Sequence, residues 1–169
     1  MNNLLNAYFK TNNKRMVSAV QRLSKESIKF QKVFPEGCSG GPLDDNLFHW
    51  RINIEGPKGT FYEGFTLTME LYFPNEYPNK PPECYFNPPI YHPNISMYDG
   101  SICADFITNP SHWKSTYTVY QIVNTFLFLL NNPNTKSCLN GKAGMYYDTN
   151  IYFYEMALKE YMTNIGQNK

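Results

Sequence analysis

Two stretches of alternating polar and apolar residues constrain the fold of this chain more than any other feature. In "LFHWRINIEG", four apolar residues from Phe48 to Ile54 alternate with polar ones, and "TLTMELYF" at residues 66–73 repeats the pattern. A period of two is typical of a strand with one buried face. Because the segment between them is short, the two strands are predicted to pair antiparallel, and "PECYF" at residues 82–86 supplies a third.

Helical periodicity flanks these strands on both sides. From about Asn13 to Gln31, apolar residues recur at helical spacing and the remaining positions are largely cationic. Residues 117–130, "YTVYQIVNTFLFLL", predict a central buried helix, and shorter patterns predict helices near residues 141–147 and 150–165. Strands and helices segregated in this way favour an α+β fold with helix covering one sheet face.

The chain reads as a single domain with an extension. Residues 1–13, rich in asparagine, are interpreted as a flexible N-terminal extension, and residues 14–165 as the domain. Two segments are predicted to be loops, "FPEGCSGGPLDDN" and the proline-rich "PNEYPNKPP".

Composition narrows the function classes. The net charge of +1 and pI near 7.6 argue against nucleic acid and membrane partners. The longest apolar run, Phe126 to Leu130, is far too short to span a bilayer, and four separated cysteines with three histidines offer no metal site. We expect a monomer without cofactor or metal, located in the cytoplasm, the nucleus or both.

Cys103 is the candidate nucleophile, in "YHPNISMYDGSICADF". Its sequence neighbours Asp99 and Asp105 would disfavour a thiolate, so a hydrolase needs His92 or His112 to approach in space. A thiol with a pKa near ambient pH suits exchange with an already activated thioester. The residues therefore favour acyl transfer and leave the Cys–His hydrolase as a rival.

Several blocks of the sequence carry a family resemblance. "YHPNISMYDGSIC", preceded by "FPNEYPNKPP" and "GPKGTFYEG" and followed by "HW", resembles the core of the ubiquitin-conjugating enzymes, from about Met16 to Tyr161. The resemblance implies their fold, a four-stranded antiparallel sheet flanked by an N-terminal helix, a central helix and two C-terminal helices. It also implies an acyl transferase that carries ubiquitin as a thioester, with no bound ATP expected.

The resemblance implies a role for each residue around the cysteine. Cys103 would accept the modifier from an activating enzyme, and Asn94 would stabilise an oxyanion or hold the nearby loop. His92 is implied to be structural. Pro93, Asp105 and Ser137 would support the active site, Ser137 standing where many members carry an aspartate.

Docking surfaces are implied in the same way. Arg22 and Lys25 match the basic helix face that contacts the activating enzyme, which plain solvation would otherwise explain. Ser39 matches a serine where some members bind a second ubiquitin, although an ordinary exposed serine is an equally good interpretation. The ligase-binding surface is implied at Tyr77, Pro78, Pro81, Pro82, Trp113 and Ser115.

Three departures from the family pattern carry expectations of their own. Cys103 follows Asn94 by nine positions, one more than in most members, so the loop "SMYDG" must bulge. Ser137 in place of an acid predicts slow lysine discharge unless a ligase or phosphorylation supplies the charge. Cys138, normally a proline, is interpreted as a free thiol, with a regulatory disulfide to Cys103 as the alternative.

Two rival functions stay open on the sequence. One is a conjugating enzyme for another ubiquitin-like modifier, and the other is an inactive variant that acts as a scaffold. The presence of both Cys103 and Asn94 argues against the scaffold. Partners are expected to be ubiquitin or a ubiquitin-like protein, the activating enzyme and ubiquitin ligases.

Overall fold

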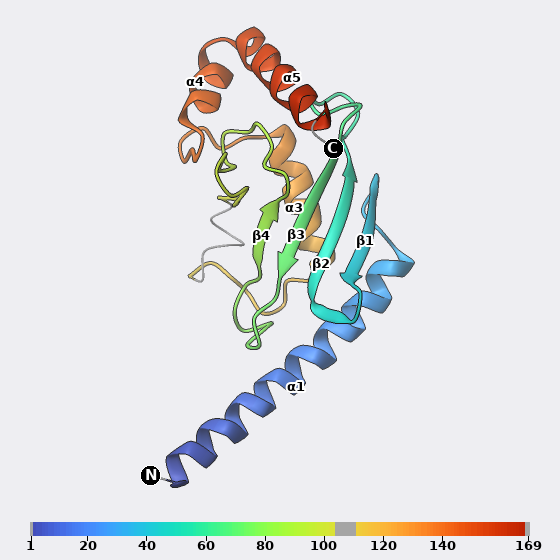
Figure 1. The fold of residues 1–169 in the computed structure, drawn as a ribbon, viewed down its shortest axis with the longest axis vertical. Helices are drawn as coiled ribbons and strands as arrows, with labels where there is room; N and C mark the ends of the chain where they lie inside the picture. Colours follow the sequence, from blue (N-terminus) through green and yellow to red (C-terminus); the bar gives the residue numbers. More distant parts are fainter. Residues whose placement is uncertain (1, 104–110, 168–169) are drawn as a thin grey trace.

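The structure is a computed structural model that describes residues 2–103 and 111–167, with side chains from residue 10 to residue 165 in those ranges. The elements in chain order are α1 (Asn2–Lys32), β1 (Cys38–Leu43), β2 (Asn46–Glu55), β3 (Thr66–Tyr72), β4 (Glu83–Phe86), α3 (Val119–Asn131), α4 (Gly141–Thr149) and α5 (Ile151–Gln167). The four strands form one sheet and the helices lie before and after it in sequence (Figure 1).

The sheet is an antiparallel meander in the order β1-β2-β3-β4. Alternation sets its two faces: Trp50, Ile52 and Ile54 of β2 are fully buried, whereas the residues between them point the other way. The predicted α+β fold with a four-stranded antiparallel sheet is confirmed. The inner face packs against helix, and the outer face carries the polar members of each alternation.

β1 corrects the prediction that residues 34–46 are loop. Glycine and proline suggested a loop, but Cys38–Leu43 pairs with β2 as an edge strand, where a proline such as Pro42 can be accommodated. Gly40 has a φ of 126°, and a Cβ there would lie 2.1 Å from the carbonyl oxygen of Arg51. The glycine is therefore what lets β1 approach β2 so closely.

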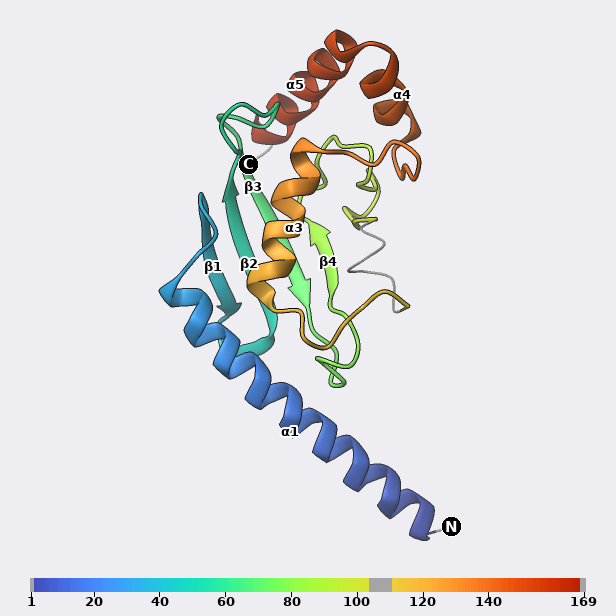
Figure 2. The same ribbon diagram turned by 180° about the vertical axis from the view of Figure 1, so that it is seen from behind.

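α3 covers the inner face of the sheet and forms the centre of the core. It lies behind the sheet in Figure 1 and in front of it in Figure 2. Thr118 and Gln121 form a capping box that begins the helix, two residues after the predicted start. Its buried residues are Val119, Ile122, Val123, Phe126, Leu129 and Leu130. The prediction of a central buried helix is confirmed.

α1 is longer than the sequence indicated. It begins at Asn2, so the predicted start near Asn13 is wrong. No glycine or proline precedes Pro35, and the helix continues outward from the end that packs through Leu23 and Phe30. The N-terminal half projects away from the sheet in both views (Figures 1 and 2). That residues 1–13 are flexible stays a prediction.

α4 and α5 lie across one end of the sheet, next to the segment that leads to Cys103 (Figure 1). Tyr154 of α5 is fully buried, and its hydroxyl lies 3.1 Å from that of Tyr62. The Tyr62 hydroxyl donates to the carbonyl oxygen of Tyr91 at 2.8 Å. The C-terminal helices are thus tied to the residue immediately before His92.

Candidate active site

Cys103 lies at the end of a hairpin-like loop that returns to Asn94. Ile95 and Ile102 form an isolated antiparallel bridge, and the Cys103 amide donates to the Asn94 carbonyl oxygen at 2.9 Å. The Cys103 side chain is half-buried, with its Sγ 3.6 Å from the Ser137 Oγ. The extra residue of "SMYDG" is therefore absorbed within the loop, and the backbones of Asn94 and Cys103 stay adjacent.

His92 has both ring nitrogens engaged away from the cysteine. It is fully buried; its Nε2 donates to the Leu129 carbonyl oxygen at 3.0 Å, and its Nδ1 accepts the Asn94 amide hydrogen at 3.0 Å. Burial lowers the pKa of His92 to about 4, although the bond to the Leu129 carbonyl opposes the shift. A neutral imidazole with no open nitrogen cannot serve Cys103 as a base. The geometry agrees with the structural role that the resemblance implies for His92.

Asn94 joins the cysteine segment to the loop before α4. Its Nδ2 donates to the carbonyl oxygens of Asn134 and Ser137, each at 2.8 Å, and its Oδ1 accepts from the Asn134 amide at 2.8 Å. Both amide hydrogens are used, and the side chain is fully buried. Of the two roles implied for Asn94, this arrangement performs the second, holding the loop.

The loop from Asn134 to Asn140 has a second attachment at Pro93. The Pro93 carbonyl oxygen accepts from the amides of Leu139 and Asn140, both at 2.9 Å. Asn140 then caps α4 by accepting from the Ala143 amide at 3.1 Å. Ser137 is therefore carried on a loop held at both ends, which keeps its hydroxyl beside the thiol of Cys103.

Cys138 points toward α4. Its Sγ donates to the Thr135 carbonyl oxygen at 3.1 Å, and a Cβ added at Gly144 would lie 2.3 Å from that sulfur. Burial, with the charges of Asp148 and Cys103, raises the pKa of the Cys138 thiol. All four cysteines lie among the described residues, and all four are thiols. A regulatory disulfide from Cys138 to Cys103 stays a prediction.

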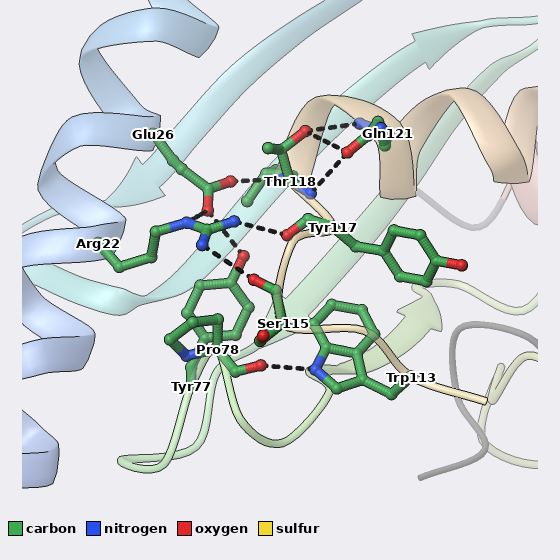
Figure 3. Close-up of polar contacts among 10 residues, drawn as sticks. Arg22, Glu26, Tyr77, Pro78, Trp113, Ser115, Tyr117, Thr118 and Gln121 are labelled. Atoms are coloured by element: carbon green, nitrogen blue, oxygen red, sulfur yellow. Dashed lines mark hydrogen bonds and ion pairs between the residues drawn. The ribbon is translucent and has the colours of Figure 1, made fainter. Parts of the chain in front are cut away.

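Arg22, predicted to contact a partner, is used within the fold. Its guanidinium forms an ion pair with Glu26 and donates to the carbonyl oxygens of Ser115 at 3.0 Å and Tyr117 at 2.7 Å (Figure 3). Lys25, one position before Glu26, is exposed. Of the two cations assigned to partner binding, the structure leaves Lys25 the more open.

Glu26 is the residue that the sequence analysis overlooked. It is 6% exposed, accepts from the Tyr77 hydroxyl at 2.9 Å, and accepts from the Val119 amide at 2.5 Å where α3 begins (Figure 3). A signal was present in the sequence, because Glu26 is the first acidic residue of the chain and lies four positions after Arg22.

Part of the predicted ligase-binding surface lies near this carboxylate, which accepts from the Tyr77 hydroxyl. Tyr77 and Pro82 are buried, Pro78, Pro81 and Trp113 are half-buried, and Ser115 is exposed. The Trp113 Nε1 donates to the Pro78 carbonyl oxygen at 2.6 Å, which links the two loops (Figure 3). The structure thus brings together residues that are more than thirty positions apart in sequence.

Two further predicted residues, Ser39 and Asp105, do not belong to this surface as the structure describes it. Ser39 is exposed on β1, opposite Asn53 of β2, on the outer face of the sheet. Asp105 lies outside the described residues. The described residues hold no group of three or more metal-binding side chains, and no described helix is long and apolar enough to cross a bilayer.

This arrangement suits transfer from an activated acyl donor. A half-buried thiol stands beside a hydroxyl, and the buried His92 is committed to other bonds. Amide hydrolysis needs a base to activate the sulfur, whereas thioester exchange proceeds with a modest thiol.

Comparison with known proteins agrees with the resemblance seen in the sequence. The family model described as "Ubiquitin-conjugating enzyme" matches residues 22–162. A curated relative, "Ubiquitin-conjugating enzyme E2 1" of Caenorhabditis elegans, is 37% identical over 153 residues, covering 88% of this chain and 78% of that protein. A solved structure titled "Novel Ubiquitin-Conjugating Enzyme" superposes with a TM-score of 0.76 at 24% identity, covering 83% of this chain and 92% of that one.

Proposed function

The chain belongs to the ubiquitin-conjugating enzyme family, and from this premise we propose that it carries ubiquitin as a thioester on Cys103 and passes it to substrate lysines with a ligase. The family is one of transferases. What the proposal adds is the modifier, the residue that carries it and the roles of the residues around that residue.

The proposed loading step is an exchange of thioesters. The Cys103 thiolate attacks the carbonyl carbon of the ubiquitin C-terminal glycine on the activating enzyme, a new C–S bond forms, and the activating enzyme's sulfur leaves as a thiolate. The proton of the Cys103 thiol passes to solvent or to the departing sulfur. No oxidant or cofactor enters the balance.

The proposed discharge step moves the same acyl group to nitrogen. A neutral lysine amine attacks the thioester carbonyl, the amine loses a proton, and Cys103 leaves as a thiolate. Ser137 stands 3.6 Å from the sulfur and offers a hydroxyl where a carboxylate would attract and desolvate the lysine. Asn94 acts as a positioning residue, because its amide hydrogens hold the loop that carries Ser137.

The proposed docking surfaces follow from exposure and charge. Lys25 on α1 is exposed and suited to an acidic surface of the activating enzyme. The linked loops around Pro78, Trp113 and Ser115 are proposed for the ligase. Arg22 contributes by holding the Ser115 loop in place.

One observation carries the proposal most directly. The Cys103 amide is bonded to the carbonyl oxygen of Asn94, and the Asn94 side chain holds the loop that places Ser137 beside the sulfur. Two segments separated by about 34 residues are brought together at the thiol in this way. A thiol buried only to fill the core would not need a polar loop held over it.

The test is thioester formation. The protein is incubated with ubiquitin, ubiquitin-activating enzyme and ATP, and a band that disappears with reductant is expected. Cys103→Ala should abolish it, whereas Cys38→Ala, which removes a thiol on β1, should retain it. A band formed only with another ubiquitin-like protein and its own activating enzyme would replace ubiquitin as the modifier. No band with any of them would refute the proposal.

A further inference from the structure

The outer face of the sheet carries a hollow beside β4 that the proposed function leaves unused. Helix α3 covers the inner face, and the outer face is the one turned toward the viewer in Figure 1. The hollow has a volume of about 530 Å³ and opens to solvent. We call it the tyrosine hollow, because three tyrosines and three carboxylates line it: Glu70, Tyr72, Glu83, Tyr85, Tyr98 and Asp99.

Glu70, at the floor of the tyrosine hollow, already has hydrogen-bond and ion-pair partners within the fold. Glu70 is 4% exposed and accepts from Arg51 at 2.9 Å, from His49 at 3.1 Å and from the Tyr72 hydroxyl at 2.6 Å. Burial opposes ionisation of Glu70, but these hydrogen bonds outweigh it and lower its pKa to about 2. The floor is thus a rigid platform, and the ring of Tyr72, stacked on His49 at 4.1 Å, is fixed with it.

The rim of the hollow carries negative charge that no described cation neutralises. Glu83 and Asp99 both lie close to Tyr85: the Tyr85 hydroxyl donates to Glu83 at 2.9 Å, and this bond, burial and the charges of both carboxylates raise the Tyr85 pKa. Among the described residues, neither carboxylate forms an ion pair with a lysine or arginine. Their hydrogen-bond donors are neutral: the Tyr85 hydroxyl for Glu83, and the Ser101 amide, at 3.0 Å, for Asp99. A cation entering the hollow would therefore meet two carboxylates that have no cationic partner among the described residues.

The loop that contains the extra residue supplies one wall. Asp99 and the fully exposed Tyr98 belong to it, and it is held against β4 by the Phe86 amide, which donates to the Gly100 carbonyl oxygen at 2.9 Å. Gly100 has a φ of 72°, and a Cβ there would lie 1.9 Å from the Phe86 carbonyl oxygen. The close approach that glycine permits holds the backbone of this loop against β4, where Asp99 and the exposed Tyr98 line the hollow.

We propose that the tyrosine hollow binds an arginine or lysine side chain of a basic segment in the substrate protein. Tyrosine faces attract cations, and the carboxylates of Glu83 and Asp99 complement the charge. The excess of carboxylates disfavours nucleic acid. Because the described residues offer no metal-binding group, a protein cation is the ligand that fits.

The hollow is close enough to the thiol to select substrates, an inference that rests on the proposed function. Asp99 precedes Cys103 by four residues, so their Cα atoms lie within about 14 Å even if the chain between them is extended. A segment with its arginine in the hollow can present a lysine a few residues away to the thioester. The preferred substrate lysines are then those with a basic residue nearby in sequence.

The first test measures binding, without any thioester. The probe is a fluorescein-labelled twelve-residue peptide of Gly and Ser with one lysine and, four residues away, two arginines; its partner has glutamines in place of the arginines. Fluorescence anisotropy should show that the double variant Glu83→Lys with Asp99→Lys binds the arginine peptide with an affinity about tenfold lower or more. The matched control, Glu36→Lys with Glu160→Lys, changes net charge equally at exposed positions elsewhere and should change affinity by less than about twofold.

Tyr98→Ala should lower the affinity for the arginine peptide by about threefold, since it removes an exposed ring that packs against nothing in the core. Thermal melting of every variant confirms folding. Equal losses in the two charge-reversed proteins would overturn the proposal, because only net charge would then matter. Binding that survives Glu83→Lys with Asp99→Lys, or equal affinity for the arginine and glutamine peptides, would overturn it as well.

The second test separates this inference from the proposed function. Each variant is loaded with ubiquitin, and discharge onto the two peptides is compared. If wild type loads normally but discharges equally onto both peptides, the proposed role of the tyrosine hollow is refuted and the proposed function is not. If the wild type fails to load, the proposed function is refuted. The anisotropy measurement then still shows whether the tyrosine hollow binds the arginine peptide.

Discussion

Asn94 and Glu26 each hold distant segments of the molecule together, the first as a neutral amide and the second as a carboxylate. Each is a buried polar side chain that joins segments far apart in sequence: Asn94 holds the loop beside Cys103, and Glu26 joins α1 to Tyr77 and to the start of α3. Asn94 is neutral and its partners are backbone groups. Glu26 is an acid whose partners include the guanidinium of Arg22.

The two junctions differ in how much each depends on a single partner. A buried amide bonded to backbone carbonyls and an amide hydrogen keeps its partners whatever the neighbouring side chains are. A buried carboxylate is stable only while its cation and donors remain, because an uncompensated buried charge is costly. The cysteine junction should therefore resist change more than the junction that supports the predicted ligase loops.

The largest expected effect is at Glu26. Glu26→Ala should lower the free energy of unfolding by about 4 kcal/mol, because the buried Tyr77 hydroxyl and Val119 amide lose their acceptor and Arg22 loses its ion pair. Urea denaturation measures this. Glu36→Ala, an exposed acid just after α1, should change it by less than about 0.5 kcal/mol. A loss at Glu26 smaller than at Asn94 would invert the comparison.

Asn94→Ala should lower the free energy of unfolding by about 3 kcal/mol, because the Asn134 amide and the carbonyl oxygens of Asn134 and Ser137 lose their partner. Thioester loading should persist while lysine discharge slows, since the loop carrying Ser137 is no longer held. Urea denaturation and single-turnover discharge measure the two effects. Asn124→Ala, which removes an amide that donates to the Tyr120 carbonyl oxygen within α3, is the control and should leave discharge unchanged.

His92 should give the cysteine region a pH dependence despite its neutral junction. Because its folded pKa is about 4 and its ordinary value is 6.5, the unfolded chain binds the proton more readily between these values. Stability should be full above pH 6.5 and fall by on the order of 2–3 kcal/mol as the pH drops to 4. Urea midpoints across this range measure it, and in His92→Gln that part of the slope should vanish.

The smallest expected effect is at Ser137. Ser137→Asp should speed discharge onto free lysine by about threefold to tenfold, around 1 kcal/mol, because a carboxylate beside the thioester attracts the amine. Thr163→Asp, exposed on α5, is the matched change of charge. Equal rates in wild type and Ser137→Asp would contradict the prediction that the missing acid slows discharge.

Much of the fold was predictable from sequence because one face of each element is buried. The alternation around Trp50 and Met69 predicted strands, and the apolar run ending at Leu130 predicted the central helix, since burial imposes the periodicity directly. The same reasoning failed at β1, where Gly40 and Pro42 look like loop residues but serve a close edge pairing. It also failed at the start of α1, because the asparagine-rich sequence before Asn13 shows no clear helical period.

The candidate site was predictable in its residues but not in its bonds. The sequence singled out Cys103, and the family resemblance added Asn94 and Ser137, yet the bonds that unite them cross about 40 positions and leave no local signal. Arg22 was predicted to contact a partner because the family resemblance implies it, whereas its helical pattern alone favours plain solvation. That its charge is taken up by Glu26 and two carbonyls depends on loops that only the tertiary fold brings near.

The projecting half of α1 has a mechanical consequence. A continuous helix rises about 1.5 Å per residue, so the stretch before Ala19, the first buried residue described on the helix, extends about 25 Å. A stiff helix of that length would hold a partner bound at its tip about that far from the packed end of α1. A protein bound at the tip would therefore stay at a distance from the sheet that the length of the helix sets.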